Sequence, residues 1–279
     1  MLQLGAHVSI SDGFGSAVQQ QVDLSGNVGQ IFVGSPRGWK VKEITNGDHD
    51  EFVDAISTHE MGPWIVHGTY LINFATPKDD LARKSIETVQ AELNACDALS
   101  IPYYVFHPGA HTGAGVDTGI ENVAQRLSEV EIPSDVTLLL ENTAGKGTTI
   151  GKTFEELNRM VAESTHSYGD LGICLDTCHL HAAGYDFSTS ESLDALIEEL
   201  DTEVGLENVK YLHLNDSKHA LGAVKDGHEH IGDAEIRDEG YRTFITDPVF
   251  RDRPMVLETP EGDEGYSWNS WKIRCLVDQ

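Results

Sequence analysis

The sequence predicts one α/β domain of the TIM (β/α)8 type that takes in the whole chain, residues 1–279. Three observations predict it: short apolar runs rich in β-formers, longer helical patterns between them, and a chain length that is common among α/β barrels. The alternation of strand and helix makes neighbouring strands parallel. A doubly wound sheet is the alternative that the pattern leaves open. The eight apolar runs are residues 2–8, 28–33, 63–67, 103–107, 136–141, 171–176, 209–215 and 254–258.

Helical patterns fill the intervals between these runs. Asp79 and Asp80 offer negative charge to the start of one helix, and Thr153 with Glu156 has the spacing of a capping box at the start of another. The sequence shows no linker, low-complexity segment or internal repeat, which also indicates one domain. The clearest helical segments are residues 79–100, 119–130, 153–163 and 190–200.

The composition excludes a membrane-spanning chain and gives no sign of a disulfide framework. No run of 18 apolar residues occurs, and the N-terminus lacks the basic and apolar segments of a signal peptide. Of the four cysteines, Cys174 and Cys178 flank Asp176 and are interpreted as small residues at a strand end. We therefore expect a cytoplasmic protein that has no membrane partner.

Acidic residues outnumber basic residues by 46 to 19, which gives a net charge of −27 at pH 7. The regular apolar runs argue against disorder, although acidic composition can indicate it. Our hypothesis is an acidic, halophilic surface adapted to a salty cytoplasm, because salt screens the self-repulsion of like charges. On its own, this charge argues against nucleic acid as a partner.

Metal-ligand residue types stand at the ends of the apolar runs. In residues 172–179 (GICLDTCH), a buried strand ends in Asp176 and is followed three residues later by His179. The carboxyl ends of barrel strands form one rim, and a buried carboxylate there needs a cation. The third to the eighth runs all deliver such residues. The nine candidate ligands are His67, His107, Glu141, Asp176, His179, His213, Asp226, His228 and Glu258.

Nine ligands are too many for one ion and fit two or three, especially if one carboxylate bridges. The set mixes imidazole with carboxylate and contains no thiolate, which suits zinc or manganese. Clusters of several metal ions serve phosphoryl-oxygen chemistry, in which one ion activates a water and others hold the leaving oxygen. The residues therefore predict a metal-dependent enzyme.

Longer motifs around these ligands run from residues 5–9 (GAHVS) to the last strand and cover nearly the whole chain. They are residues 66–73 (VHGTYLIN), 106–109 (FHPG), 140–145 (LENTAG), 175–179 (LDTCH), 182–186 (AAGYD), 213–218 (HLNDSK) and 257–260 (LETP). In content and order they resemble endonuclease IV, the family of apurinic/apyrimidinic endonucleases, which has the xylose-isomerase-like TIM barrel.

The resemblance implies three Zn²⁺ ions per chain, with Mn²⁺ as an alternative at one or more sites. All nine positions carry the residue type that the family pattern requires. In this pattern Glu141 bridges the first two ions. The implied sites are His67, His107 and Glu141; then Glu141, Asp176, His213 and Glu258; and finally His179, Asp226 and His228.

The resemblance also implies that the partner is double-stranded DNA containing abasic sites. The reaction would be hydrolysis of the phosphodiester on the 5′ side of the abasic site, which leaves a 3′-hydroxyl and a 5′-deoxyribose phosphate. Blocked 3′ ends can also be trimmed. A hydroxide shared by the first two ions would attack phosphorus, with Glu141 as the catalytic residue that orients or deprotonates it. No obligate protein partner is implied.

The resemblance further implies that three residues enter the DNA where the abasic nucleotide leaves the helix: Arg37, Tyr70 and Leu71. Two glycines depart from the family pattern, because Gly38 replaces a longer polar residue and Gly227 replaces a common arginine. We expect the chemistry to survive both changes and DNA affinity to be the property at risk. Eight of the 19 basic residues lie in loops that follow strands, where they would form a one-sided basic patch: Arg37, Lys40, Lys42, Lys78, Lys146, Lys152, Lys218 and Lys225.

The alternative enzyme is a metal-dependent sugar isomerase or epimerase on the same barrel. Such enzymes use one or two metal ions, so His179, Asp226 and His228 would have no role. An alternative outside enzymes is a metal-storage or DNA-scaffold protein, which would bind intact duplex without cleaving it.

Overall fold

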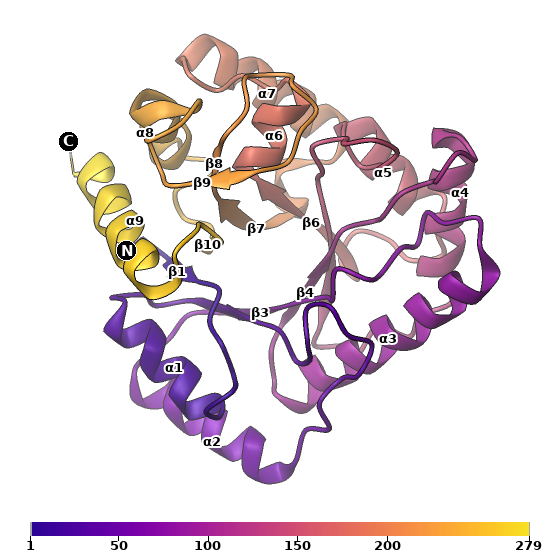
Figure 1. Cartoon of the computed structure of the whole chain (residues 1–279), viewed down its shortest axis with the longest axis horizontal. Coiled ribbons are helices and arrows are strands. Elements are labelled where there is room, and N and C mark those ends of the chain that lie inside the picture. The colour runs from indigo at the N-terminus through magenta and orange to yellow at the C-terminus, as the bar shows by residue number, and fades with distance from the viewer. Residues whose placement is uncertain (1, 279) are drawn as a thin grey trace.

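Eight parallel strands follow one another around a barrel in the computed structural model, which describes residues 2–278 (Figure 1). Their order is β1-β10-β7-β6-β5-β4-β3-β2, so that neighbours in sequence are neighbours in space. This arrangement confirms the predicted (β/α)8 class. The bounds are β1 (Leu4–Ala6), β2 (Gly29–Ile31), β3 (Trp64–His67), β4 (Tyr103–Phe106), β5 (Thr137–Glu141), β6 (Leu171–Asp176), β7 (Val209–Leu214) and β10 (Met255–Leu257).

The barrel closes where the chain following β1 meets β2. His7 and Gln30 form a parallel bridge there, and the Val8 backbone N–H donates to the Gln30 carbonyl at 2.9 Å. On its other side, β1 pairs with β10, with Leu4 opposite Met255. Closure removes the free strand edges that an open parallel sheet would expose.

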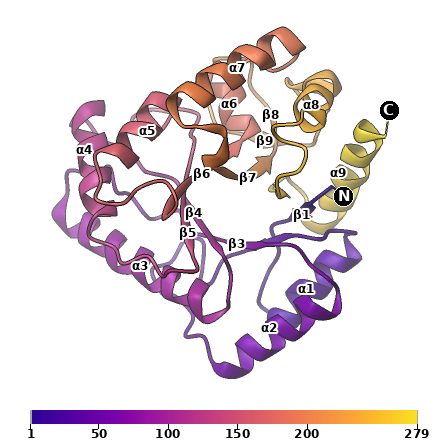
Figure 2. The same ribbon diagram turned by 180° about the vertical axis from the view of Figure 1, so that it is seen from behind.

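Helices surround the strands in both face-on views (Figures 1 and 2). The four predicted helical segments are confirmed with small shifts at their ends. The Thr153 hydroxyl accepts from the Glu156 N–H as predicted, but the Glu156 carboxylate accepts from Gly151 and Lys152, so the expected capping box is only half formed. The helices are α1 (Phe14–Asp23), α2 (Asn46–Thr58), α3 (Asp79–Ala98), α4 (Val116–Leu127), α5 (Phe154–Ala162), α6 (Thr177–Ala183), α7 (Ser190–Glu203), η1 (Leu206–Asn208), α8 (Arg237–Thr246) and α9 (Gly262–Val277).

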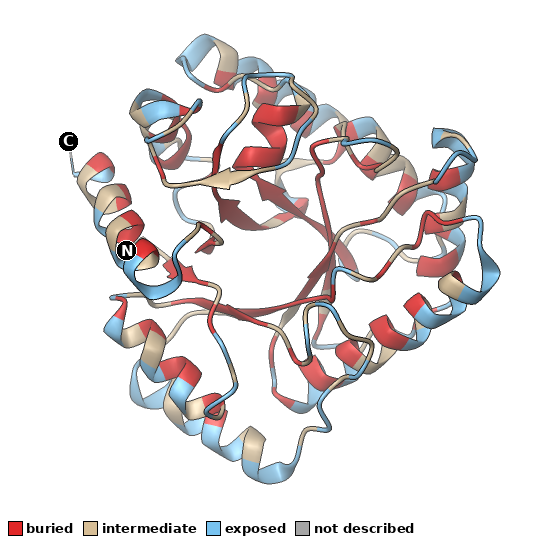
Figure 3. Ribbon diagram, in the orientation of Figure 1, coloured by how far each residue is buried: buried red, intermediate tan, exposed pale blue. Residues whose placement is uncertain are grey.

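The apolar core has two layers. The larger layer lies between the strands and the helices, and Figure 3 shows buried residues on the strands and on parts of the helices, with exposed residues on the outer turns. A smaller layer takes one residue from each of six strands and one from just before β2, and so fills the barrel interior. Its members are Val28, Ile65, Val105, Leu139, Cys174, Tyr211 and Val256.

A short antiparallel hairpin that the sequence did not predict follows β7. It consists of β8 (Asp216–Ser217) and β9 (His228–Glu229). The buried Asp216 carboxylate fixes the loop beyond it by accepting from the N–H groups of Ile236 at 2.9 Å and Gly232 at 2.8 Å. The hairpin brings Asp226 and His228 back over the barrel rim.

Removing side-chain volume from the inner layer tests how much the stability of the barrel depends on this layer. Leu139 is fully buried, so Leu139→Ala is expected to lower the free energy of unfolding by about 3 kcal/mol through lost burial and a residual cavity. Denaturant unfolding measures this change. The control is Leu221→Ala, which removes the same atoms from a side chain that is 46% exposed and should cost less than about 0.5 kcal/mol. Equal losses in both variants would contradict the assignment of an inner layer.

Candidate metal centre

The nine predicted ligands converge at the carboxyl ends of the strands. His67, Glu141 and Asp176 are the last residues of β3, β5 and β6. Parallel pairing keeps neighbouring ends level, and it places Asp176 opposite His213 of β7. His179 arrives by another route: α6 begins directly after β6, and the Asp176 carboxylate caps it by accepting from the His179 N–H at 2.8 Å.

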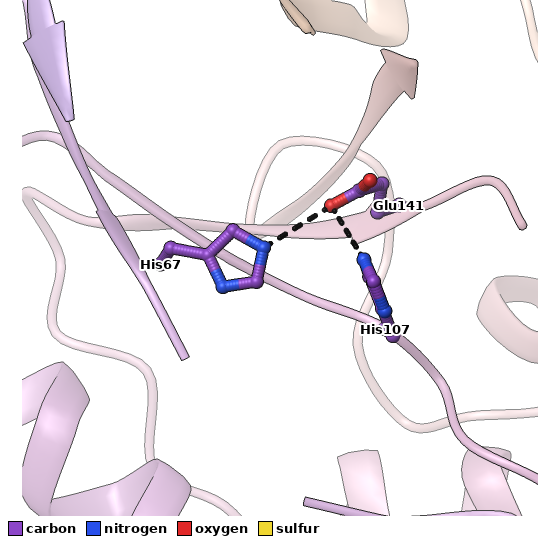
Figure 4. A group of neighbouring side chains, drawn as sticks. All are labelled: His67, His107 and Glu141. Atoms are coloured by element: carbon purple, nitrogen blue, oxygen red, sulfur yellow. Dashed lines mark ion pairs between the residues drawn. The ribbon is translucent and has the colours of Figure 1, made fainter. Parts of the chain in front are cut away.

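Glu141 lies at the centre of the cluster and is fully buried. Figure 4 shows the rings of His67 and His107 directed at the same oxygen of its carboxylate, Oε2, at 3.4 and 3.2 Å from their Nε2 atoms. The other oxygen, Oε1, lies 3.1 Å from His179 Nδ1 and 3.4 Å from His213 Nδ1. One carboxylate therefore faces four imidazoles, which lie on β3, in the loop after β4, on α6 and on β7.

A second part of the cluster lies beside Glu141 and includes the hairpin loop. The Asp226 carboxylate lies 3.4 Å from His179 Nε2 and 3.6 Å from His228 Nε2. His228 Nε2 is also 3.7 Å from Asp176 Oδ2. His179 faces both parts, because its Nδ1 is directed at Glu141 and its Nε2 at Asp226.

The cluster contains four groups of three residues, and within each group the donor atoms all lie within 4.8 Å of one another. Two of them coincide with the first and third sites that the family resemblance implies. In the second implied site, Glu258 stands outside the group, but its Oε2 lies 3.5 Å from His213 Nδ1. The groups are His67, His107 and Glu141; Glu141, Asp176 and His213; His179, Asp226 and His228; and Asp176, Cys178 and His228.

Five of the donor atoms fit metal ions because they are buried and have no hydrogen-bond partner in the described chain. Both carboxylate oxygens of Glu141 lack a hydrogen-bond partner among residues 2–278, as do the inward-facing nitrogens of His67, His179 and His213. Buried polar atoms without partners cost free energy. Cations between these atoms would satisfy all of them at once, with ligand types that zinc and manganese accept.

In the metal-free chain, the carboxylates and imidazoles of the cluster stabilise each other's charged forms. Burial alone would raise the pKa of Glu141, but His107 and His213 outweigh it and hold the pKa well below its usual range. Burial alone would lower the pKa of His179, yet Asp176 and Asp226 raise it well above its usual range. The centre therefore holds protons on imidazoles that metal ions would have to displace.

Two asparagines that the sequence interpretation missed hold two of the candidate carboxylate ligands in place. The Asn215 amide donates to Asp176 Oδ2 at 2.6 Å and accepts from the Glu258 N–H at 2.9 Å. Asn142 accepts from the Asp176 N–H at 2.7 Å. Both asparagines lie within the motifs at residues 140–145 and 213–218, so position in a ligand motif was the available signal.

Cys178 lies closer to the ligands than the sequence interpretation assumed. Its sulfur is within 4.8 Å of the donor atoms of Asp176 and His228. The thiol donates to the Gly227 carbonyl at 3.7 Å, and burial raises its pKa to about 12. Cys178 is therefore a neutral thiol that holds the hairpin loop.

The three predicted DNA-contacting residues lie on two adjoining loops. Arg37 is exposed, Tyr70 is 55% exposed, and Leu71 is partly buried. The loops are joined at the Pro36 carbonyl, which accepts from the Thr69 hydroxyl at 2.9 Å and from the Tyr70 N–H at 3.0 Å. The Tyr70 ring centroid lies 5.4 Å from that of His67, so these loops border the metal cluster.

Two neighbouring cavities open beside the cluster. One, of about 410 Å³, is lined by Tyr70, Gly227 and six of the candidate ligands, among them His107 and Glu258. The other, of about 470 Å³, is more apolar, and its lining includes Trp39, Tyr70, Leu71, Ile72 and Lys146. A ligand can therefore contact the donor atoms and the Tyr70–Leu71 loop together.

The barrel and its His/Glu/Asp clusters define a metal-binding enzyme of the xylose-isomerase-like class. Residues 25–272 match the family model for xylose isomerase-like TIM barrels. A probable endonuclease 4 of Halobacterium salinarum is 46% identical over 276 residues, which cover 99% of each chain. A probable endonuclease 4 of Natronomonas pharaonis is 45% identical over 280 residues, which cover 100% of each chain. This chain belongs to the endonuclease IV family.

Solved structures agree with this assignment. Endonuclease IV from Thermus thermophilus superimposes with a TM-score of 0.86 at 33% identity, covering 99% of both chains. A D-tagatose 3-epimerase-like protein superimposes with a TM-score of 0.74 at 16% identity, covering 98% of this chain and 97% of the other. At that identity the likeness shows the fold alone. The family's halophilic members are among the similar proteins, as the acidic composition led us to expect.

Among residues 2–278, no helix combines the length and the apolar character that crossing a bilayer requires.

A buried acid beneath the Tyr70 loop predicts a pH-dependent stability. Glu92 accepts from the Tyr104 hydroxyl at 2.7 Å and from the Thr69 N–H at 3.3 Å. Burial raises its pKa from 4.5 to about 7 in spite of these bonds. An acid whose pKa is raised by folding stabilises the fold below the unfolded pKa, and this stabilisation disappears as pH rises through about 7.

Glu92→Gln removes this titration. In the metal-free chain, the variant should gain up to about 3 kcal/mol of unfolding free energy relative to the parent between pH 5 and pH 8. Denaturant unfolding at both pH values measures the gain. The control is Glu87→Gln on the exposed side of the same helix, which should show no such gain. Parallel pH profiles for Glu92→Gln and the parent would contradict the raised pKa.

Proposed function

We propose that this chain hydrolyses the phosphodiester on the 5′ side of abasic sites in double-stranded DNA. The products are a 3′-hydroxyl and a 5′-deoxyribose phosphate, and blocked 3′ ends are trimmed by the same centre. The observation that carries the proposal is the buried Glu141 carboxylate, which faces four imidazoles within a nine-residue ligand set. Membership of the endonuclease IV family supports the choice of reaction.

We propose three Zn²⁺ ions per chain, with Mn²⁺ able to replace zinc at one or more sites. His67, His107 and Glu141 would hold the first. Glu141 would also contact the second ion, and the β8–β9 hairpin would supply two ligands of the third ion. When bound, the ions supply acidification of a water and neutralisation of charge on phosphate oxygens. The remaining ligands are Asp176, His213 and Glu258 for the second ion, and His179, Asp226 and His228 for the third.

The protein's own residues would position the reacting groups. Glu141 stays ionised and offers two oxygens at the point where the strand ends meet, so it can accept a hydrogen bond or a proton from the attacking water. The water oxygen joins phosphorus, the bond from phosphorus to the 3′ oxygen breaks, and that oxygen takes up a proton. Tyr70, Leu71 and Arg37 would fill the space left in the duplex. By filling it, they would keep the abasic sugar in the cavity.

The distribution of basic side chains supports a DNA-facing rim. We predicted eight basic residues in the loops that follow strands, and two of these are neutralised: Lys42 pairs with Asp48, and Lys218 with Glu229. The side chains of the other six form no ion pair or hydrogen bond within the described chain, although acidic residues are in large excess. Phosphates can neutralise such cations. The six are Arg37, Lys40, Lys78, Lys146, Lys152 and Lys225.

Incision of a defined duplex tests the proposal. A labelled duplex with one abasic-site analogue should be cut on the 5′ side of the lesion at high salt, with about three metal ions per chain, and chelation should abolish cutting. Glu141→Gln should lower the rate by at least about 100-fold, because it weakens the bridge between two ions.

The same duplex without the lesion is the control and should stay intact. Binding of duplex without incision would favour the scaffold alternative. Conversion of ketose–aldose pairs by a chain with one or two metal ions would favour the sugar isomerase, and either result would overturn the proposal.

The Tyr70 loop should act on binding more than on chemistry. Tyr70→Ala is expected to raise KM by about tenfold and to change kcat less, because it removes a ring that contacts the distorted duplex. Steady-state incision kinetics measure both constants. The matched control is Trp271→Ala, which removes an aromatic side chain that is 60% exposed on α9 and should change neither constant. A fall in kcat with an unchanged KM would contradict this role for Tyr70.

A further inference from the structure

Gln30 lies beneath the metal cluster, and nothing in the reaction scheme gives it a role. Its side chain is fully buried in the middle of β2, and its amide contacts two of the candidate ligands. The amide oxygen lies 2.7 Å from His213 Nε2, and the amide nitrogen lies 2.6 Å from Glu258 Oε1. We propose that Gln30 is a positioning residue that holds His213 and Glu258 in their metal-binding orientation, an inference that rests on the metal centre proposed above.

The chemistry of the partners fixes the orientation of the Gln30 amide. An ionised Glu258 carboxylate can only accept hydrogen bonds, so the amide nitrogen must face it. The amide oxygen then faces His213, where it can only accept. The second amide hydrogen is directed at His7 Nδ1, 2.8 Å away. Both hydrogens and the oxygen of the amide are therefore used, and a flipped amide would place oxygen against carboxylate.

This orientation selects one tautomer of His213. Because the Gln30 oxygen only accepts, His213 must carry a hydrogen on Nε2. In the neutral ring Nδ1 then has a free lone pair, and Nδ1 is the atom directed at Glu141 and Glu258, at 3.4 and 3.5 Å. A metal ligand needs that lone pair. The hydrogen bond on the far nitrogen of a ligating histidine orients the ring and selects its tautomer in this way.

Because of the same amide, the two carboxylate oxygens of Glu258 have different partners. Oε1 accepts from Gln30, so Oε2 is left facing His213 and the cluster. From β2, Gln30 thus contacts one ligand on β7 and one that follows the neighbouring strand β10. Both ligands belong to the second implied site, together with Asp176 and the shared Glu141.

The backbone of Gln30 holds the amide rigidly. Its carbonyl accepts from the Val8 N–H at 2.9 Å in the bridge that closes the barrel, opposite His7. His7 packs against Phe32, with 4.3 Å between ring centroids. The amide is therefore anchored at the seam of the barrel, and a side chain of the same length without the amide can occupy the space without supplying the hydrogen bonds.

Metal binding by Gln30→Met tests the inference. Methionine fills similar volume, so the barrel should persist while His213 and Glu258 lose their common partner. The zinc affinity of one ion, the one assigned to His213 and Glu258, should fall by about 10- to 100-fold, with the others retained. The measurements are zinc per chain after dialysis against a graded chelator, and competition with a chromophoric chelator.

The matched control is Gln21→Met. Gln21 is also fully buried, but its amide bonds only the backbone of Ala6, so its loss should lower stability and leave zinc content unchanged. If Gln30→Met does not fold, Gln30→Asn withdraws the amide from both ligands by one methylene and should show the same selective loss.

The outcomes separate the two proposals. Zinc affinities equal to the parent's in a folded Gln30 variant would overturn the positioning role and leave the proposed function intact. Uniform loss of all ions, matched by Gln21→Met, would also overturn it. A parent chain that binds no metal would instead refute the proposed function.

Discussion

The burial of the Glu141 carboxylate is the constraint on which the rest of the site depends. A charged carboxylate with no hydrogen-bond partner cannot remain buried at the centre of a barrel unless positive charge surrounds it. Four imidazoles supply that charge when they carry protons, and the proposed metal ions would supply it once the protons leave. Asparagine and glutamine side chains would then fix the directions of the candidate ligands, because metal ions require particular geometry as well as charge.

The barrel supports the charged centre with an apolar layer below it and with loops above it. An apolar inner layer fills its interior below the rim, so that the ligands at the strand ends rest on a packed floor. Loops above the rim carry six basic side chains that have no partner within the described chain, while most other basic residues form ion pairs or hydrogen bonds. In an acidic protein at high salt, phosphate contacts are weakened, so the ions and the Tyr70 loop would carry more of the binding.

The sequence alone predicted the barrel and the nine candidate ligands, because apolar runs alternate with helices and each of six runs delivers an ionisable residue at or near its end. The other three candidates, His179, Asp226 and His228, follow two of these runs. It did not predict the β8–β9 hairpin, whose strands are two residues long and are fixed by Asp216 through bonds to the loop beyond. Gln30 was also missed. Its partners are 183 and 228 residues away in the chain, and only the closure of the barrel brings them together. The pairing of Lys42 and Lys218 with acids likewise depends on side-chain positions that loop membership does not specify.

Anomalous diffraction from crystals of the zinc-loaded protein tests the central claim most directly. Data on both sides of the zinc absorption edge locate each ion without reference to activity. The account predicts peaks on both sides of the Glu141 carboxylate, one beside His67 and His107 and one beside His213, with a further peak between Asp226 and His228. Zinc that binds elsewhere, with the Glu141 oxygens in contact with imidazoles only, would contradict it.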